Sequence, residues 1–328
     1  MLKNLGVRNE HDIRYYARDI SENFLQRGSD TTAKLETTLR FLKEETGLKN
    51  LVKLNEGHIK NIVSNFQEKL KEGMSLSNIN GYISSINNIA RYIGKNELRI
   101  NAKEAGLTRK YDYIKNKENT LEASDKFKEY LKAQYFKTDE IKFMAAYHSV
   151  NLMRNCNLRL SESLGIKILN KPIDTKLNLN KNDQTKHGRK RTVGLYNNAQ
   201  KTALMEAKDF LKSNGLKNLN TLGTMKKGQD FMQNVLKDFK SKTGEKFHFH
   251  GERQAWAHDK YNHLWLEKGF NIECNGKLEM DKKEWLEKTA QDTDLTVKDV
   301  KNIDKEIRTV ITKDLGHESL TQTKFYLG

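Results

Sequence analysis

The chain contains a single proline, Pro172, among 328 residues. Proline lacks a backbone donor and clashes with the preceding turn of a helix, so a chain almost free of it can form long uninterrupted helices. Apolar residues also recur at three- and four-residue steps, as in Ile62, Phe66 and Leu70. We therefore expect a mainly α-helical fold.

The expected helices form two groups separated by a charged segment. The first group covers about 9–26, 31–46, 56–72 and 77–94, with glycines near the helix ends. The second covers about 125–136, 139–156, 198–213, 228–241, 251–268, 282–291 and 296–314. The segment between them loses its apolar periodicity. We predict a helical domain over 1–100, a linker over 101–124 and a second domain over 125–328.

The pattern changes between Ile166 and Tyr196. Three short runs, GIKIL, KLNLN and RKRTVGLY, resemble β-strands and are separated by Asn, Asp and Gly. The sequence therefore predicts a small antiparallel sheet inside the otherwise helical second domain.

The charge of the chain points to a polyanionic partner. Lys and Arg number 59 against 43 Asp and Glu, a formal net charge of +16. No stretch approaches the roughly 20 apolar residues that cross a bilayer, and the N-terminus has no apolar signal core. We expect a cytoplasmic, nucleoid-associated protein, or one in the equivalent compartment of a host cell, with no membrane contact. The two cysteines, Cys156 and Cys274, exclude a disulfide scaffold and a cysteine-based zinc module.

Five short segments of the second domain, in order, resemble the conserved boxes of the tyrosine recombinase (phage integrase) family. They are NLRLSESLGIKI, TKHGRKRTVGL, HGERQAWAHDKY, LGHESL and QTKFY. Their order and spacing are more specific than any single box, and the last tyrosine follows the LGHESL histidine by nine residues. The resemblance assigns six candidate catalytic residues: Arg159, Lys186, His250, Arg253, His317 and Tyr326.

These residue types suit phosphoryl transfer without a metal. A phosphodiester attacked by a phenol develops negative charge, which fixed cations and hydrogen-bond donors can stabilise. Arginine donates two parallel hydrogen bonds to phosphate. A lysine in a hairpin can protonate the leaving oxygen, and an imidazole can accept the phenol proton. His250 and Arg253 lie three residues apart at the start of a helix, so both can point into one site.

The resemblance implies a fold, an activity and partners. The fold is a helical core-binding (SAM-like) domain followed by a mixed α/β catalytic domain, which together close around duplex DNA. The activity is site-specific recombination through a 3′-phosphotyrosyl bond to Tyr326 and a Holliday junction, without a cofactor. Arg159, Arg253 and His317 would hold the phosphate, His250 would be the base and Lys186 the acid. The partners are a recombination site, three further copies of the chain on DNA and a possible accessory protein. An integrase of a phage or other mobile element is the expected type, although a chromosome-dimer resolvase uses the same boxes.

Other classes of protein remain open. A type IB topoisomerase uses the same chemistry as a monomer, and a DNA-binding protein without activity could keep the same fold. A metal site at His248, His250 and His258 is disfavoured, because there is no HExxH pattern and no carboxylate at ligand spacing.

The sequence departs from the family pattern in several places. Gly194, Gln254 and Ala255 replace the usual proline, histidine and small hydroxyl residue. Residues of about 275–300 look like an insertion with an extra helix, whose Trp285 and Leu286 should pack on the catalytic domain rather than on a neighbouring protomer. Only Leu327 and Gly328 follow Tyr326. We expect this chain, lacking the tail that links neighbours, to be monomeric in free solution.

Overall fold

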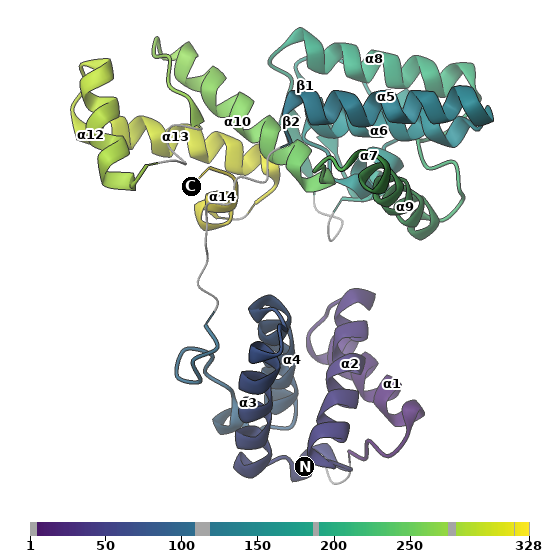
Figure 1. The fold of residues 1–328 in the computed structure, drawn as a ribbon, viewed down its shortest axis with the longest axis vertical. Coiled ribbons are helices and arrows are strands. Elements are labelled where there is room, and N and C mark those ends of the chain that lie inside the picture. Colours follow the sequence, from purple (N-terminus) through teal and green to yellow (C-terminus); the bar gives the residue numbers. More distant parts are fainter. Residues whose placement is uncertain (1–4, 109–118, 186–189, 275–279, 318, 328) are drawn as a thin grey trace. The chain divides into compact units, whose positions relative to one another are not determined.

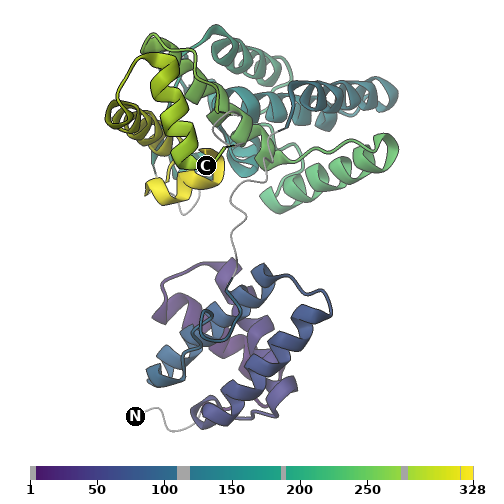
Figure 2. The same cartoon turned by 60° about the vertical axis from the view of Figure 1, so that its left-hand side comes forward.

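The chain forms two compact units, Met1–Tyr111 and Asp112–Gly328. The structure is a computed structural model that describes residues 5–108, 119–185, 190–274, 280–317 and 319–327. Figures 1 and 2 show that each unit is built mainly of helices. This is the mainly helical fold with a small antiparallel sheet that the sequence predicts.

The described part of the N-terminal unit contains four α-helices. They are α1 (Glu10–Arg18), which continues as a π-helical segment over Asp19–Phe24, α2 (Ser29–Thr46), α3 (Glu56–Lys71) and α4 (Leu76–Tyr92). Side chains cap three of them, because Asn9, Asn55 and Ser75 accept hydrogen bonds from backbone N–H groups of the first turn. The rings of Phe41 and Phe66 stack in its core with centroids 5.2 Å apart.

Described residues at both ends of the predicted linker, 101–124, pack with the two units. Leu107 is fully buried in the core of the N-terminal unit, and Ile100 exchanges two hydrogen bonds with the Asn87 side chain. At the other end, α5 begins at Leu121 rather than at 125. The charged composition of 101–124 hid the burial of Leu107, since a few apolar residues are enough to hold the chain against a core.

The described residues of the C-terminal unit form helices and two strands. The strands lie between its third and fourth described α-helices in chain order. In chain order the elements are α5 (Leu121–Thr138), α6 (Ile141–Cys156), α7 (Leu160–Gly165), β1 (Lys176–Leu179), β2 (Arg191–Gly194), α8 (Asn198–Ser213), α9 (Met225–Thr243), α10 (Phe249–Glu267), α12 (Lys282–Thr293), α13 (Val297–Leu315) and α14 (Leu320–Leu327).

The sheet is smaller than predicted. Strands β1 and β2 pair antiparallel, with Leu177 opposite Val193 and Leu179 opposite Arg191. The prediction of a strand at GIKIL was wrong: Ile168–Asn170 forms a 3₁₀ turn. Ile166 and Ile168 are both buried there, so their alternation reflects packing against the core without a partner strand. The sequence also missed α7 and α14, which are too short to show a clear helical period.

The segment that looked like an insertion packs on the C-terminal unit. Trp285 of α12 is buried, and its ring lies edge-on to that of Trp265 of α10 with centroids 6.4 Å apart. Leu286 is partly buried against the same core. The expectation that these residues pack on the second domain is confirmed. Among the described residues, no helix combines the length and the apolar composition that a membrane span requires.

Candidate active site

The site begins at a sharp turn between α6 and α7. Helix α6 ends at Cys156, and Asn157 adopts the left-handed conformation with φ 55°, which asparagine tolerates better than most residues. Arg159 follows this turn by two residues and is the residue that precedes the first turn of α7. Asn157 is buried, and its side-chain amide donates to the carbonyl of Asp314 at 2.9 Å. The turn is thereby fixed to the end of α13.

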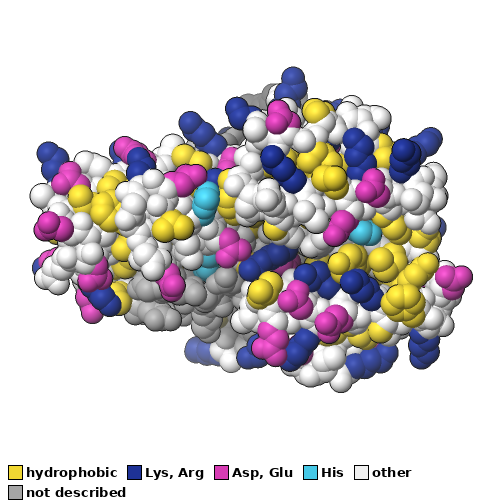
Figure 3. Space-filling model, turned by 90° about the horizontal axis from the view of Figure 1, so that it is seen from above, with side chains coloured by type: hydrophobic (Ala, Val, Ile, Leu, Met, Phe, Trp, Pro, Cys, Tyr) yellow, Lys and Arg dark blue, Asp and Glu magenta, His cyan; other side chains and the backbone are white. Residues whose placement is uncertain are grey.

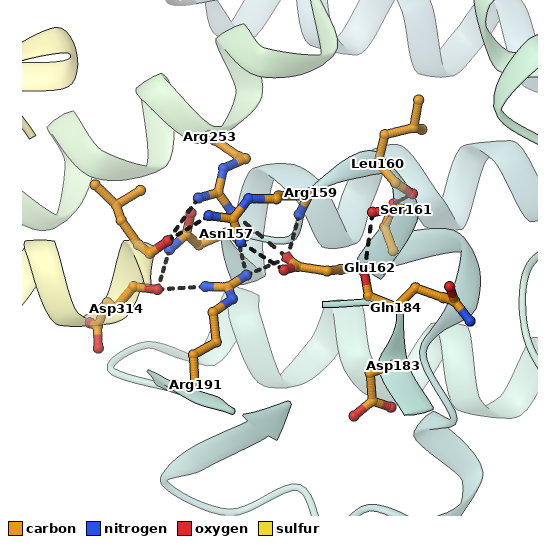
Figure 4. A network of polar contacts seen from close by, with 12 residues as sticks. Asn157, Arg159, Leu160, Ser161, Glu162, Asp183, Gln184, Arg191, Arg253 and Asp314 are labelled. Carbon is orange, nitrogen blue, oxygen red and sulfur yellow. Dashed lines mark hydrogen bonds and ion pairs between the residues drawn. The ribbon is translucent and has the colours of Figure 1, made fainter. Parts of the chain in front are cut away.

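Glu162 of α7 is the centre of the charged network in Figure 4. Its carboxylate is fully buried and accepts hydrogen bonds from Arg159 at 2.8 Å and from Arg191 at 2.5 Å. A third guanidinium, that of Arg253, lies 3.9 Å away. Burial acts to raise the pKa of Glu162, but the charges of Arg191 and Arg253 outweigh it and lower the pKa. Glu162 is therefore an anion that holds three arginines together.

The three arginines come from three different elements. Arg253 of α10 and Arg191 of β2 are buried, whereas a quarter of the Arg159 side chain is exposed. Arg159 and Arg253 both donate to the carbonyl oxygen of Leu315, at 3.1 and 3.2 Å. The end of α13 is thus the point where the two guanidinium groups meet.

Burial changes the pKa values of two of these arginines. It lowers the pKa of Arg191 to about 10, with Arg253 adding to the effect and Glu162 opposing it. Burial also lowers the pKa of Arg253, while the nearby Tyr326 phenol opposes that change. Arg191 therefore still carries its positive charge at neutral pH.

Tyr326 lies beside both candidate histidines. Its side chain is only 5% exposed, and its ring centroid is 5.2 Å from that of His250 and 5.3 Å from that of His317. The backbone of α14 is held by His258, whose Nε2 lies 2.6 Å from the carbonyl oxygen of Tyr326. Because a carbonyl oxygen can only accept, this nitrogen of His258 carries the hydrogen.

His317 follows α13 and contacts a threonine of α14. Its Nδ1 lies 3.2 Å from Oγ1 of Thr323, which in turn lies 2.7 Å from Oγ1 of Thr312. Burial, with the charges of Arg253 and Arg159 adding to it, lowers the pKa of His317 to about 4. The imidazole is neutral at pH 7.

A cavity of about 510 Å³ opens beside the arginines. Its walls include Arg159, Arg253 and His250, together with Gln233 and Lys240 of α9. Among the described residues that line it, none is an aspartate or a glutamate. The cavity therefore offers donors and positive charge, which suits an anionic group such as a phosphate.

Positive and negative side chains are mixed on one face of the molecule. Figure 3 shows one face of the molecule, on which Lys and Arg side chains are interspersed with Asp and Glu side chains. That face presents no basic patch of one sign, so it is not distinguished as a surface for a polyanion.

The structure brings five of the six predicted residues together. Arg159 and Arg253 meet at the Leu315 carbonyl, and Tyr326 lies against His250 and His317. Lys186 lies outside the described residues. The described part of the chain holds no group of three or more His, Cys, Asp or Glu that could bind a metal ion.

Sequence reasoning missed several members of the site. Arg191, Asn157 and Thr323 were given no role, and Glu162 was noted only for its position in the first box. Arg191 could have been found from strand alternation, since it lies two residues before the buried Val193 and faces the same side. Gly316 fits this arrangement, because a Cβ at its position would lie 2.8 Å from Cδ of Arg191.

Comparisons with known proteins agree with this architecture. No family profile and no curated protein sequence matches the chain. Among solved structures, the chain is similar to the Tn1549 transposon integrase in complex with transposon right end DNA, at 14% identity and a TM-score of 0.56. The same integrase in complex with circular intermediate DNA gives 12% identity and a TM-score of 0.54. Both matches cover 96% of this chain and 94% of the other.

The XerA recombinase matches at 12% identity and a TM-score of 0.38, over 98% of this chain and 94% of the other. Because the sequence identities are low, the two integrase matches establish the fold alone. The chain has the fold of the tyrosine recombinases.

Proposed function

We propose that this chain is a site-specific DNA recombinase that breaks and rejoins strands through a covalent bond to Tyr326. The observation that carries the proposal is the position of Tyr326, whose ring lies against two histidines and whose phenol faces Arg253. The solved structure of the Tn1549 integrase, which has the same fold, is a complex with transposon right end DNA. This supports DNA as the substrate.

The first step is the attack of Tyr326 on a phosphodiester. The phenol oxygen bonds to phosphorus as its proton passes to His250, and the bond from phosphorus to the 5′ oxygen breaks. The leaving 5′ oxygen takes a proton from Lys186, which gives a 3′-phosphotyrosine and a free 5′ hydroxyl. Attack by the 5′ hydroxyl of another strand reverses the step, so the bond energy is conserved and no nucleotide cofactor is required.

The arginines stabilise the charge that develops in this step. Arg159 and Arg253 are already oriented by the Leu315 carbonyl, and Glu162 bonds Arg159 at 2.8 Å and lies 3.9 Å from Arg253. Donors that are oriented before the reaction need no reorganisation as the charge appears, which makes them effective in catalysis. Four protomers on two DNA sites would exchange strands through a Holliday junction.

Cleavage is expected to proceed unchanged in excess EDTA. The cationic side chains occupy the place that a metal ion takes in most nucleases. The assay uses a nicked duplex that carries a site selected from a random pool. Cleavage beside the nick releases a short 3′ fragment, and without the 5′ hydroxyl of that fragment the covalent complex cannot be resealed. Loss of the complex on chelation, with recovery on addition of Mg²⁺, would refute the proposed chemistry.

A separate assay distinguishes a recombinase from a topoisomerase. Relaxation of plasmids without any preferred site would indicate a topoisomerase.

Lys186→Ala is expected to slow cleavage of ordinary DNA by about 10²–10⁴-fold. The defect should be much smaller on a duplex whose bridging 5′ oxygen is replaced by sulfur, because a thiolate leaves without protonation. Lys190→Ala serves as the matched control and should cleave both duplexes at the normal rate. Equal defects of the Lys186 variant on the two substrates would assign the acid role to another group.

A further inference from the structure

A row of buried hydroxyl groups connects His317 to the backbone of α13. Oγ1 of Thr312 lies 2.6 Å from the carbonyl oxygen of Arg308, one turn earlier in the helix. Oγ1 of Thr323 lies 2.7 Å from Oγ1 of Thr312, and Nδ1 of His317 lies 3.2 Å from Oγ1 of Thr323. Thr323 is fully buried and Thr312 is 6% exposed. Solvent therefore has little access to the two hydroxyls.

The hydrogen atoms in this row can be placed by elimination. A carbonyl oxygen only accepts, so the hydrogen between Thr312 and Arg308 belongs to the hydroxyl of Thr312. A threonine hydroxyl has one hydrogen, so the hydrogen between the two threonines belongs to Thr323. Thr323 then has none left for His317. The contact at Nδ1 requires that the imidazole donates, which places its hydrogen on Nδ1.

This assignment decides what His317 offers to the site. A neutral imidazole carries one hydrogen, so with Nδ1 protonated its Nε2 is an acceptor. Positive groups surround the ring: Arg253, Arg159 and Arg191, with His250 nearby and Tyr326 of α14 against its face. Burial, with the charges of Arg253 and Arg159 adding to it, lowers the pKa of His317 and keeps the ring neutral in the free protein.

An acceptor at Nε2 conflicts with a direct contact to phosphate. Phosphate oxygens at this pH accept hydrogen bonds, so two acceptors would face each other. The contact becomes favourable only when Nε2 also carries a hydrogen, and the imidazole then holds two hydrogens and a positive charge.

We propose that Thr323 and Thr312 are positioning residues that hold His317 in the Nδ1–H form, so that the site takes up one proton at Nε2 when a DNA phosphate binds. The proton comes from solvent. The imidazolium then donates to Thr323 through Nδ1 and to a non-bridging oxygen through Nε2. The tautomer rests on the contacts of the free protein, whereas the proton uptake rests on the proposed function.

The tautomer can be measured directly by nitrogen NMR of the full chain labelled with ¹⁵N-histidine, with the His317 signals assigned from a His317→Asn variant. The wild-type protein at neutral pH should show hydrogen on Nδ1. Thr312→Val should reverse the tautomer, because the Thr323 hydrogen becomes free to donate to Nδ1. Thr323→Val should remove the preference, and Thr323→Ser should retain it.

Two results would overturn the assignment. One is hydrogen on Nε2 of His317 in the wild-type protein. The other is an unchanged tautomer in folded Thr312→Val. The wild-type measurement stands even if a valine variant fails to fold. A purely structural role for the threonines would lower stability without altering the nitrogen signals.

Proton uptake is measured by calorimetry of DNA binding in buffers of different ionisation enthalpy, with Tyr326→Phe as the background to prevent cleavage. At about pH 6 the uptake should be larger by close to one proton with Thr323 than with Thr323→Val, and Thr323→Ser should behave as Thr323. Equal uptake with threonine and valine would refute the coupling. Failure of the chain to cleave DNA would refute the proposed function but leave the tautomer measurement intact.

Discussion

Tyr326→Phe is expected to abolish the covalent protein–DNA complex while leaving DNA binding unchanged. The substitution removes only the attacking oxygen, so the rate of complex formation should fall by at least about 10³-fold. The phenyl ring keeps the contacts with His250 and His317, and His258 holds the backbone carbonyl rather than the side chain. Helix α14 should therefore remain in place. The complex is measured on denaturing gels with the nicked duplex, and binding by fluorescence anisotropy.

Tyr196→Phe is the matched control for this experiment. Tyr196 lies in the same unit, follows β2, and its ring contacts the Lys260 ammonium at 3.9 Å from the centroid. Removing its hydroxyl keeps that ring and should leave complex formation at the normal rate. Persistence of the complex in Tyr326→Phe would assign the nucleophile to another residue.

Glu162→Ala is expected to destabilise the C-terminal unit by about 3–5 kcal/mol, because it leaves buried cations without their partner. Arg191 and Arg253 are buried, and Glu162 is the carboxylate that bonds Arg191 and lies nearest to Arg253 among the described ion pairs. The unfolding free energy is measured by tryptophan fluorescence in denaturant. All three tryptophans, Trp256, Trp265 and Trp285, lie in this unit, so the signal is insensitive to the N-terminal one.

The control is Glu140→Ala, which removes an exposed carboxylate paired with Lys142 at 2.6 Å. Exposed pairs of this kind contribute about 0–1 kcal/mol, so this variant should unfold close to the wild type. A Glu162→Ala protein as stable as Glu140→Ala would show that the buried network does not hold the unit together.

The sequence predicted the parts of the fold that follow long periodic patterns. Most of the longer helices lie within a few residues of their expected bounds, as α8 over Asn198–Ser213 shows. Short elements were the failures, because six to eight residues contain too few turns to define a period. The run GIKIL failed for another reason: two isoleucines with one residue between them can both be buried without a strand.

The sequence predicted the site as a set of residue types in a fixed order. The structure adds the contacts that position these residues. No local pattern indicates that Glu162 would bond Arg191, which lies 29 residues further along the chain. The contact from Asn157 to Asp314 spans 157 residues and depends on where α13 ends. Such partners follow from the tertiary fold, whereas a catalytic box can be seen in a few consecutive residues.

The most direct test of the account is the identity of the residue that carries DNA after trapping. The covalent complex formed by the wild-type protein is digested with nuclease and trypsin, and the modified peptide is sequenced by mass spectrometry. Trypsin cuts after Lys324, so the account predicts a nucleotide 3′-phosphate on Tyr326 in the peptide that begins at Phe325. A nucleotide on any other residue, or attachment through a 5′-phosphate, would contradict it.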